Sequence, residues 1–231
     1  MSAPSPKPVF LLAGGGGRRL SGPDPLLRAV FEASGRSAPV IAYIGAANDD
    51  NPGFLERMAA RFGEAGAGRV TLAALAGARD ETQVNRARKV LRGADVIFLS
   101  GGDVERGMRI LRERGVIPDL RALYDEGVAF FGSSAGSIML ARQWVRWRDP
   151  DDDATAETFE CLGLAPLVCD VHGEDEDWLE LRALLRLLPD KTVGYGIPSG
   201  AALVAYPGGR VESLGAPLDR LVRHGNRITA K

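Results

Sequence analysis

The feature that most constrains the fold is a set of short apolar runs, each followed at once by glycine or by Ser-Gly. These runs are rich in β-branched or aromatic residues and do not alternate with polar ones: 8–13, 39–44, 96–99 and 128–131. A half-exposed strand alternates apolar and polar side chains, whereas a strand covered on both faces is apolar throughout. The runs therefore predict central strands of a sheet that has helices on both sides.

Amphipathic stretches separate these runs along the chain. Apolar residues recur at helical spacing in 53–63, 81–91, 104–114 and 119–126. Strands that alternate with helices, joined by right-handed crossovers, form a parallel sheet. The sequence therefore predicts an α/β fold with a doubly wound, mostly parallel sheet and helices on both faces.

The C-terminal part has a different pattern, with a predicted helix over 174–188 followed by short strands. The predicted strands are 192–197, 201–206 and 210–214. The last two are separated by Pro207-Gly208-Gly209, which predicts a short C-terminal β-hairpin. Nothing in the 231 residues resembles a linker, so we expect one α/β domain over 1–231, with 1–7 as a flexible polar arm.

Composition and charge exclude two classes of partner. Hydrophobic residues make up 45% and charged residues 26% of the chain, ordinary values for a protein that buries a core. A net charge of −1 offers no basic face for phosphates, so we expect no nucleic-acid partner. No stretch approaches the roughly 18 apolar residues that span a bilayer, so we expect no membrane partner. The oligomeric state stays open, with a homo-oligomer as one option.

The two cysteines, Cys161 and Cys169, are too few for a disulfide framework and are not accompanied by other metal ligands in the sequence. We interpret them as reduced, half-buried thiols. The segment 1–7 is polar and lacks an apolar signal region. These features predict a cytoplasmic protein, and they indicate no metal.

The four glycines Gly14 to Gly17 follow the first predicted strand and invite comparison with a dinucleotide-binding fingerprint. The match is poor, because the residues after them, Arg18 to Pro23, do not open a helix cleanly. No acidic residue ends the second predicted strand to hold a ribose. We favour a glycine-lined turn that another backbone approaches closely.

The run Gly132-Ser133-Ser134-Ala135-Gly136 has the Gly-X-Ser-X-Gly pattern of a nucleophile elbow. A strand precedes it and a helix follows, which is the context that the motif requires. The turn would lift the Ser134 hydroxyl to the sheet edge and place the Ala135 amide where it can donate to an oxyanion. The alternative is a tight turn without chemistry.

A seryl nucleophile needs a base, and the chain has only two histidines, His172 and His224. His172 ends the apolar run 164–171 and precedes a predicted helix, which places it at the same edge as Ser134. His224 lies among basic residues near the C-terminus and is expected on the surface. The base is therefore predicted to be His172, the alternative being a solvated loop histidine.

These residues, in this order and spacing, resemble the serine peptidases that include aspartyl dipeptidase (peptidase E) and cyanophycinase. The likeness covers nearly the whole chain and is carried by 13–16, 97–103, 132–136, 170–172 and 194–203. It implies a fold similar to that of class I glutamine amidotransferases, with Ser134 as nucleophile and His172 as base. It also implies an oxyanion hole made by the amides of Gly102 and Ala135, and no metal or cofactor.

Two segments depart from the pattern of that family. Relatives carry an acidic residue that orients the histidine, in a segment like Gly-Ile-Asp-Glu, where this chain has Gly196-Ile197-Pro198-Ser199. Ser199 therefore stands in the orienting position without a charge. We expect either Ser199 itself or a carboxylate from elsewhere to serve; Asp170 is the first choice and the others are Glu174, Asp175 and Asp177. The second departure, Asp103-Val104, predicts an altered substrate pocket.

We interpret the chain as a serine peptidase or amide hydrolase that acts on small peptides. A preference for acidic N-terminal residues follows from the resemblance alone and needs a cationic receptor, for which the candidates are Arg18, Arg19, Arg142, Arg146 and Arg148. Asp149 stands where aspartyl dipeptidases carry an aspartate, and both a substrate contact and a solvated acidic loop remain open. The rival function is a weak or inactive relative that binds a small ligand or partner protein in the same pocket. An amidotransferase is disfavoured, because its elbow residue is cysteine.

Overall fold

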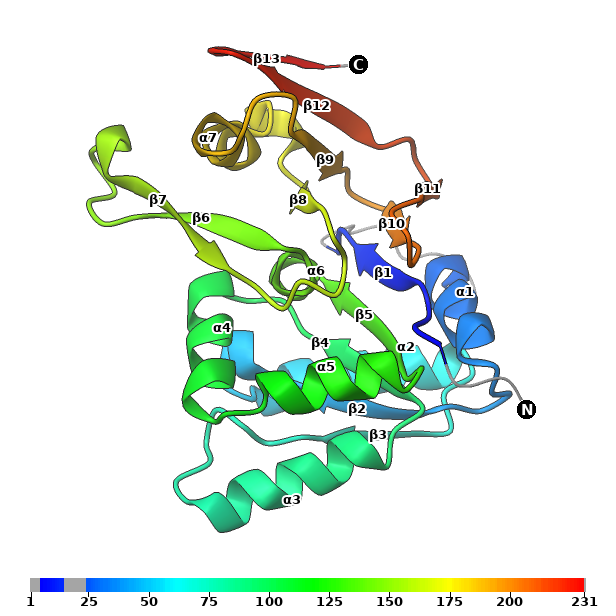
Figure 1. Ribbon diagram of the computed structural model, residues 1–231. Helices are drawn as coiled ribbons and strands as arrows, with labels where there is room; N and C mark the ends of the chain where they lie inside the picture. Colours follow the sequence, from blue (N-terminus) through cyan, green and yellow to red (C-terminus); the bar gives the residue numbers. More distant parts are fainter. Residues whose placement is uncertain (1–4, 15–23, 231) are drawn as a thin grey trace.

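The computed structural model describes residues 5–14 and 24–230 (Figure 1). Its largest sheet has seven strands in the order β11-β10-β1-β5-β4-β2-β3. The strands are β1 (Val9–Leu12), β2 (Val40–Ile44), β3 (Arg69–Leu72), β4 (Val96–Leu99), β5 (Ala129–Ser133), β10 (Ala202–Ala205) and β11 (Val211–Leu214). The five strands from β1 to β3 in this order are parallel, and β10 and β11 add an antiparallel hairpin at one edge. The predicted doubly wound sheet and its C-terminal hairpin are confirmed.

Helices cover both faces of this sheet, as the uniformly apolar strands predict. They are α1 (Pro25–Ser34), α2 (Pro52–Glu64), α3 (Glu81–Arg92), α4 (Val104–Glu113), α5 (Ile117–Asp125) and α6 (Ala135–Leu140). Alternate residues of one strand serve opposite cores: Phe10 packs with the α1 and α2 side, whereas Leu11 belongs to the core beneath α3 to α6. Each strand residue is therefore buried whichever way it points.

A second sheet, which the sequence pattern did not reveal, packs above the first. Its order is β13-β12-β9-β8, formed by β8 (Val168–Val171), β9 (Val193–Ile197), β12 (Asp219–His224) and β13 (Arg227–Ala230). A separate antiparallel hairpin, β6 (Gln143–Trp147) with β7 (Ala156–Glu160), extends outward beside α6 (Figure 1). Short 3-10 turns are η1 (Ala46–Asn48), η2 (Asp153–Thr155) and η3 (Glu174–Glu176). The larger core cluster runs from the first sheet through α6 to the second.

The single helix predicted over 174–188 is wrong. The chain forms η3, turns through Asp177 (φ 49°) and Trp178 (φ 58°), and only then begins α7 (Leu179–Leu187). Trp178 is the reason: its buried indole lies over Gly196, where a Cβ would come within 2.4 Å of the ring, and its Nε1 donates to Asp219 at 3.1 Å. Docking of this ring on the second sheet overrides helical continuity.

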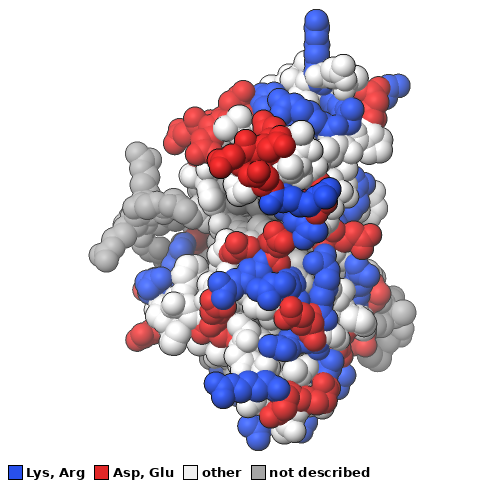
Figure 2. Space-filling model, turned by 90° about the vertical axis from the view of Figure 1, so that its left-hand side faces the viewer, with Lys and Arg blue, Asp and Glu red and all other residues white. Residues whose placement is uncertain are grey.

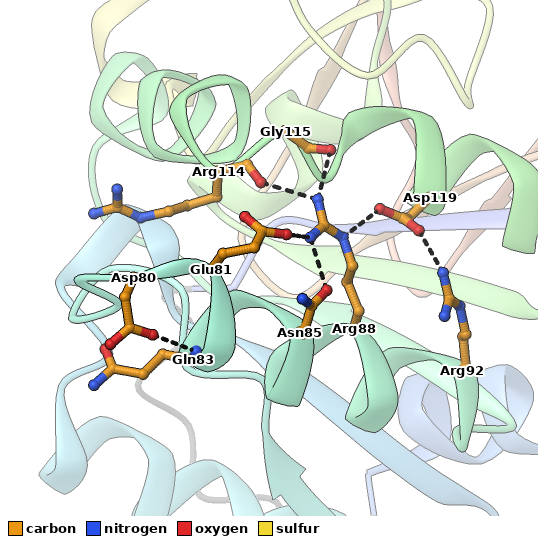
Figure 3. A network of polar contacts seen from close by, with 9 residues as sticks. All are labelled: Asp80, Glu81, Gln83, Asn85, Arg88, Arg92, Arg114, Gly115 and Asp119. Carbon is orange, nitrogen blue, oxygen red and sulfur yellow. Dashed lines mark hydrogen bonds and ion pairs between the residues drawn. The ribbon is translucent and has the colours of Figure 1, made fainter.

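Arg88 connects two helices on the outer side of the first sheet (Figure 3). From α3 it donates to Glu81 at 2.6 Å and Asn85 at 3.1 Å, and it reaches Asp119 of α5 at 2.9 Å. Two further bonds go to the carbonyls of Arg114 and Gly115, each at 3.3 Å. The guanidinium therefore donates to the two carbonyls that follow α4 as well as to an acidic residue in the first turn of α5.

Within 5–14 and 24–230, no helix is both long and apolar enough to cross a bilayer.

Candidate active site

Ser134 occupies a sharp turn between β5 and α6, with φ 53° and ψ −127°. Its amide donates to the carbonyl of Leu12 at 3.0 Å, which fixes the turn to the neighbouring strand. The flanking glycines are needed: a Cβ on Gly132 would lie 2.4 Å from the carbonyl carbon of Gly136, and a Cβ on Gly136 would lie 2.0 Å from the carbonyl oxygen of Leu99. The turn therefore has the geometry that the Gly-X-Ser-X-Gly pattern predicts.

His172 follows β8 and also has a positive φ, 43°. Its backbone amide donates to the carbonyl of Ile197 at 3.0 Å, so β9 holds the residue in position. The ring nitrogen Nε2 lies 2.9 Å from Oγ of Ser134. The structure thus brings together two residues from different sheets, whereas His224 lies exposed at the end of β12 and does not line the same cavity.

Gly102 and Ala135 lie on the wall of the cavity that contains this pair. Gly102 has φ 143°, and a Cβ there would come within 2.0 Å of the carbonyl oxygen of Ala47, so the position accepts only glycine. Ala135 is the first residue of α6, where backbone amides have no intrahelical acceptor. Among residues 5–14 and 24–230, neither amide donates to another group. Both amides are therefore free to bind an anion or a carbonyl oxygen.

Asp170, the first choice for a third member, is buried at 5% exposure but makes no hydrogen bond to His172 in the described structure. Its Oδ1 accepts the amide of Val171 at 2.7 Å. Burial raises the pKa of Asp170 to about 7; the hydrogen bond from the Val171 amide lowers this pKa and the nearby carboxylate of Glu180 raises it, but burial is the largest of these effects. Asp170 therefore resists ionisation, unlike the charged acid that stabilises an imidazolium.

Ser199 is exposed, and its backbone amide donates to Oε1 of Glu174 at 2.9 Å. The second oxygen, Oε2, is buried and has no hydrogen-bond partner in the described residues. Burial alone would raise the pKa of Glu174, but the bonds from Ser199 and from its own backbone, with the charge of His172, hold that pKa below its ordinary value. The carboxylate of Glu174 therefore lies beside Ser199, the position at which relatives carry an acidic residue. The other two acids, Asp175 and Asp177, are exposed.

The pair opens onto a cavity of about 700 Å³, called here the cleft. The β6–β7 hairpin forms one wall with Trp144, Trp147 and Phe159, and α7 forms another with Leu179, Glu180, Ala183 and Arg186. Of the arginines considered as an acid receptor, Arg18 and Arg19 lie outside the described residues and Arg142 does not line the cleft. Arg146 lines it but is paired with Glu105 and Glu157, and Arg148 is paired with Glu157.

Three further sequence expectations have a place in the structure. Cys161 and Cys169 are unpaired and fully buried, not half-buried, and burial raises the pKa of Cys161 to about 12. Asp149 lies in the loop at the tip of the β6–β7 hairpin, where its Oδ1 accepts the amide of Asp151 at 3.1 Å and shapes the loop. Gly14 has φ 75° and packs against Ser133, but Gly15 to Gly17 lie outside the described residues. In the part of the chain described, no three His, Cys, Asp or Glu side chains gather to hold a metal.

A serine–histidine pair at a strand–helix turn, with unpaired amides beside it, is the arrangement that defines serine hydrolases. Over residues 10–212 the chain matches the model of peptidase family S51, and it belongs to that family. It is 30% identical over 117 residues to a peptidase E of Citrobacter koseri, a match that covers 46% of this chain and 50% of that protein. The chain thus spans half the length of that relative.

The chain is also similar to one further curated protein and to a solved structure. Over 72 residues, 31% of this chain and 37% of the other, it is 38% identical to the pyridoxal 5'-phosphate synthase subunit PdxT of Mycolicibacterium vanbaalenii. Among solved structures, a peptidase from an acI-B1 Actinobacterium superimposes with a TM-score of 0.73 at 16% identity, covering all of this chain and 96% of that one. At that identity the likeness shows the fold. The fold and family expected from the sequence motifs are therefore confirmed.

Proposed function

We propose that the protein is a cytoplasmic serine peptidase that hydrolyses small peptides through an acyl-enzyme on Ser134. The observation that carries this proposal is the 2.9 Å contact between Oγ of Ser134 and Nε2 of His172 at the strand–helix turn. A seryl hydroxyl becomes a competent nucleophile when a base within hydrogen-bonding reach removes its proton. Membership of peptidase family S51 supports the same chemistry.

The geometry suggests the order of events. With Nε2 unprotonated, His172 takes the proton of Ser134 as Oγ attacks the peptide carbonyl carbon. The carbonyl oxygen becomes an anion, and the amides of Gly102 and Ala135 donate to it. His172 then gives its proton to the leaving amine as the C–N bond breaks. Water, deprotonated by His172, hydrolyses the acyl-enzyme and restores Ser134.

Glu174 is our candidate for the group that orients His172. Its carboxylate accepts a hydrogen bond from the amide of Ser199, and its other oxygen is buried without a partner among the described residues; Glu174 is also two residues from His172. A carboxylate that accepts from Nδ1 would fix the ring tautomer and stabilise the imidazolium. Asp170 suits this role less, because its burial favours the neutral acid. Ser199 would then act through its backbone, as the clamp on Glu174.

The rival function, an inactive relative that binds a ligand in the cleft, rests on one observation. In the described residues, no carboxylate is hydrogen-bonded to His172. Hydrolysis separates the two functions: Ser134→Ala and His172→Ala should each lower kcat by about 10⁴ or more, and the double variant should be little worse, because the two groups act as a unit. Additive losses, or a wild type that hydrolyses no dipeptide, would favour the inactive relative.

A further inference from the structure

Asn48 belongs to η1, at the carboxyl end of β2, and its side chain reaches the loop that follows β4. β5, β4 and β2 are adjacent strands, so Ser134, Gly101 and Asn48 follow three neighbouring strand ends. Nδ2 of Asn48 donates to the carbonyl of Gly101 at 3.0 Å and to Oγ of Ser100 at 3.1 Å. A carbonyl oxygen only accepts, so the group of Asn48 that faces Gly101 is its NH2.

The peptide unit that Asn48 contacts lies directly against the nucleophile. A Cβ on Gly101 would come within 3.1 Å of Cβ of Ser134 and 3.6 Å of its Oγ. The bond from Gly101 to Gly102 is trans, so the carbonyl of Gly101 and the amide of Gly102 point in opposite directions. Asn48 holds the carbonyl on the side of η1, and the amide therefore points away from η1. This amide has no acceptor among the described residues, and Gly102 lines the cleft.

The backbone at this point is intrinsically free to turn. Glycine reaches both signs of φ at little cost, so the unit between Gly101 and Gly102 can rotate and exchange the directions of its carbonyl and its amide. In the next peptide unit, the amide of Asp103 donates to the carbonyl of Ala47 at 2.8 Å, which holds the loop in place. In the part of the chain described, no group other than Asn48 donates to the Gly101 carbonyl. The direction of this one peptide unit therefore depends on Asn48.

Asn48 is itself held on its other side. Its Oδ1 accepts the amide of Asn51 at 3.3 Å, and its backbone amide donates to the carbonyl of Gly45 at 2.9 Å. Asp50 ties the same turn to the loop after β3, because its Oδ2 accepts the amide of Ala76 at 2.8 Å. The NH2 group of Asn48 is therefore aimed at Gly101 by a turn that is fixed on two sides.

We propose that Asn48 is a positioning residue for the oxyanion hole, which holds the carbonyl of Gly101 so that the amide of Gly102 faces the carbonyl oxygen of the substrate. This inference rests on the proposed peptidase function. Asn48 does not line the cleft, so its loss should spare substrate binding and weaken only the state in which that oxygen carries charge. Without Asn48 the peptide unit turns, and the hole keeps the amide of Ala135 alone.

The first test is Asn48→Asp, which removes the donor, keeps the shape, and keeps the acceptor for the amide of Asn51. The new carboxylate repels the Gly101 carbonyl. We expect kcat on a dipeptide to fall by roughly 10²–10³, the effect of losing one oxyanion donor, with KM within about threefold of wild type. Asn48→Ala, which adds no charge, should lose at least about tenfold in kcat, and it serves if the first variant does not fold. Wild-type kcat in both variants, or a loss confined to KM, would overturn the inference.

A peptide aldehyde gives a readout that a merely structural role would not move. Oγ of Ser134 bonds to the aldehyde carbon, His172 takes the serine proton, and the aldehyde oxygen becomes the anion in the hole. In Asn48→Asp, the inhibition constant of the aldehyde should rise by the factor by which kcat/KM falls. The matching peptide alcohol forms no adduct, and its inhibition constant should stay within about twofold of wild type. Equal weakening of both inhibitors, or of neither, would overturn the inference.

Asn51→Asp is the matched control, because it makes the same substitution three residues along the chain. Asn51 caps α2, where its Oδ1 accepts the amide of Phe54 at 2.9 Å, and aspartate caps a helix as well as asparagine does. Figure 2 shows basic and acidic side chains mixed over much of one face of the molecule, so one added charge changes the overall field little. We expect kcat and both inhibition constants within about twofold of wild type. A loss equal to that of Asn48→Asp would assign the effect to charge and overturn the inference.

Labelling of wild-type Ser134 by a fluorophosphonate decides the proposed function separately. An unlabelled wild type would refute the peptidase, and the inference with it. A labelled wild type beside a fully active Asn48→Asp would refute the role of Asn48 alone.

Discussion

Ser134 and His172 share an uncommon backbone feature, a positive φ at a residue other than glycine. Such conformations cost on the order of 1–3 kcal/mol and persist where the surrounding structure enforces them. Here the bond from Ser134 to Leu12 and the bond from His172 to Ile197 enforce them. Both residues whose side chains meet are therefore among the residues with such a backbone, and these two bonds hold both side chains at the sheet edge.

Glu174 allows a prediction about the orientation of the base. Glu174→Gln removes the charge but keeps the acceptor for the Ser199 amide, so we expect kcat to fall by roughly 10²–10⁴ with KM nearly unchanged. Ser199→Ala keeps the backbone amide and should lower kcat only a few-fold. Steady-state kinetics on a dipeptide measure both. A damaging Ser199→Ala beside a harmless Glu174→Gln would show that the serine hydroxyl orients His172.

Asp170 makes stability depend on pH. Its pKa is about 7 in the folded protein, above the ordinary value of 3.8, so the folded state keeps this proton after the unfolded state has lost it. Stability from this group therefore falls as pH rises from about 4 to 7. Asp170→Asn removes that loss, and its unfolding free energy relative to wild type should rise by on the order of 3 kcal/mol across this range. Urea unfolding at pH 4.5 and 8 measures it, and a pH-independent difference would contradict the assignment.

At the scale of elements, Arg88 is expected to stabilise the α3–α5 pair. Its side chain is only 17% exposed and donates to five groups, so Arg88→Ala should lower the unfolding free energy by about 1–3 kcal/mol. Arg92→Ala breaks only an exposed pair with Asp119 and should cost about 0–1 kcal/mol. Chemical denaturation checks both. Equal effects would mean that the network of Figure 3 adds nothing beyond single ion pairs.

Elements fixed by local pattern could be predicted from the sequence, and those fixed by distant contacts could not. The strand 96–99 and the turn at Ser134 follow from apolar runs and small residues, which act within a few positions. The break at Trp178 depends on Gly196 and Asp219, which are 18 and 41 residues away. The position of Glu174 depends on the bond from the amide of Ser199, which is 25 residues away. The sequence could therefore limit the carboxylate that orients His172 to a small group of acidic residues, but it could not identify which of them does so.

At the scale of the whole molecule, the candidate site joins two sheets. Ser134 comes from the first sheet and His172 from the second, and their 2.9 Å contact requires both sheets to pack on α6. The sequence predicted a shared edge but not the second sheet, because pairing of β8 with β9 and β12 joins segments far apart in the chain. The continuous core across both sheets is what keeps the two side chains within reach.

The most direct test of the central claim is reaction of the native protein with a fluorophosphonate, followed by mass spectrometry of its peptides. The reagent phosphonylates a serine that a base has activated: Oγ forms a bond to phosphorus, fluoride leaves, and the base takes the serine proton. We expect one adduct per chain, on Ser134 and not on Ser133, and almost none in His172→Ala. An unmodified native protein, or an adduct that forms equally well in His172→Ala, would contradict the claim that Ser134 and His172 form a catalytic pair.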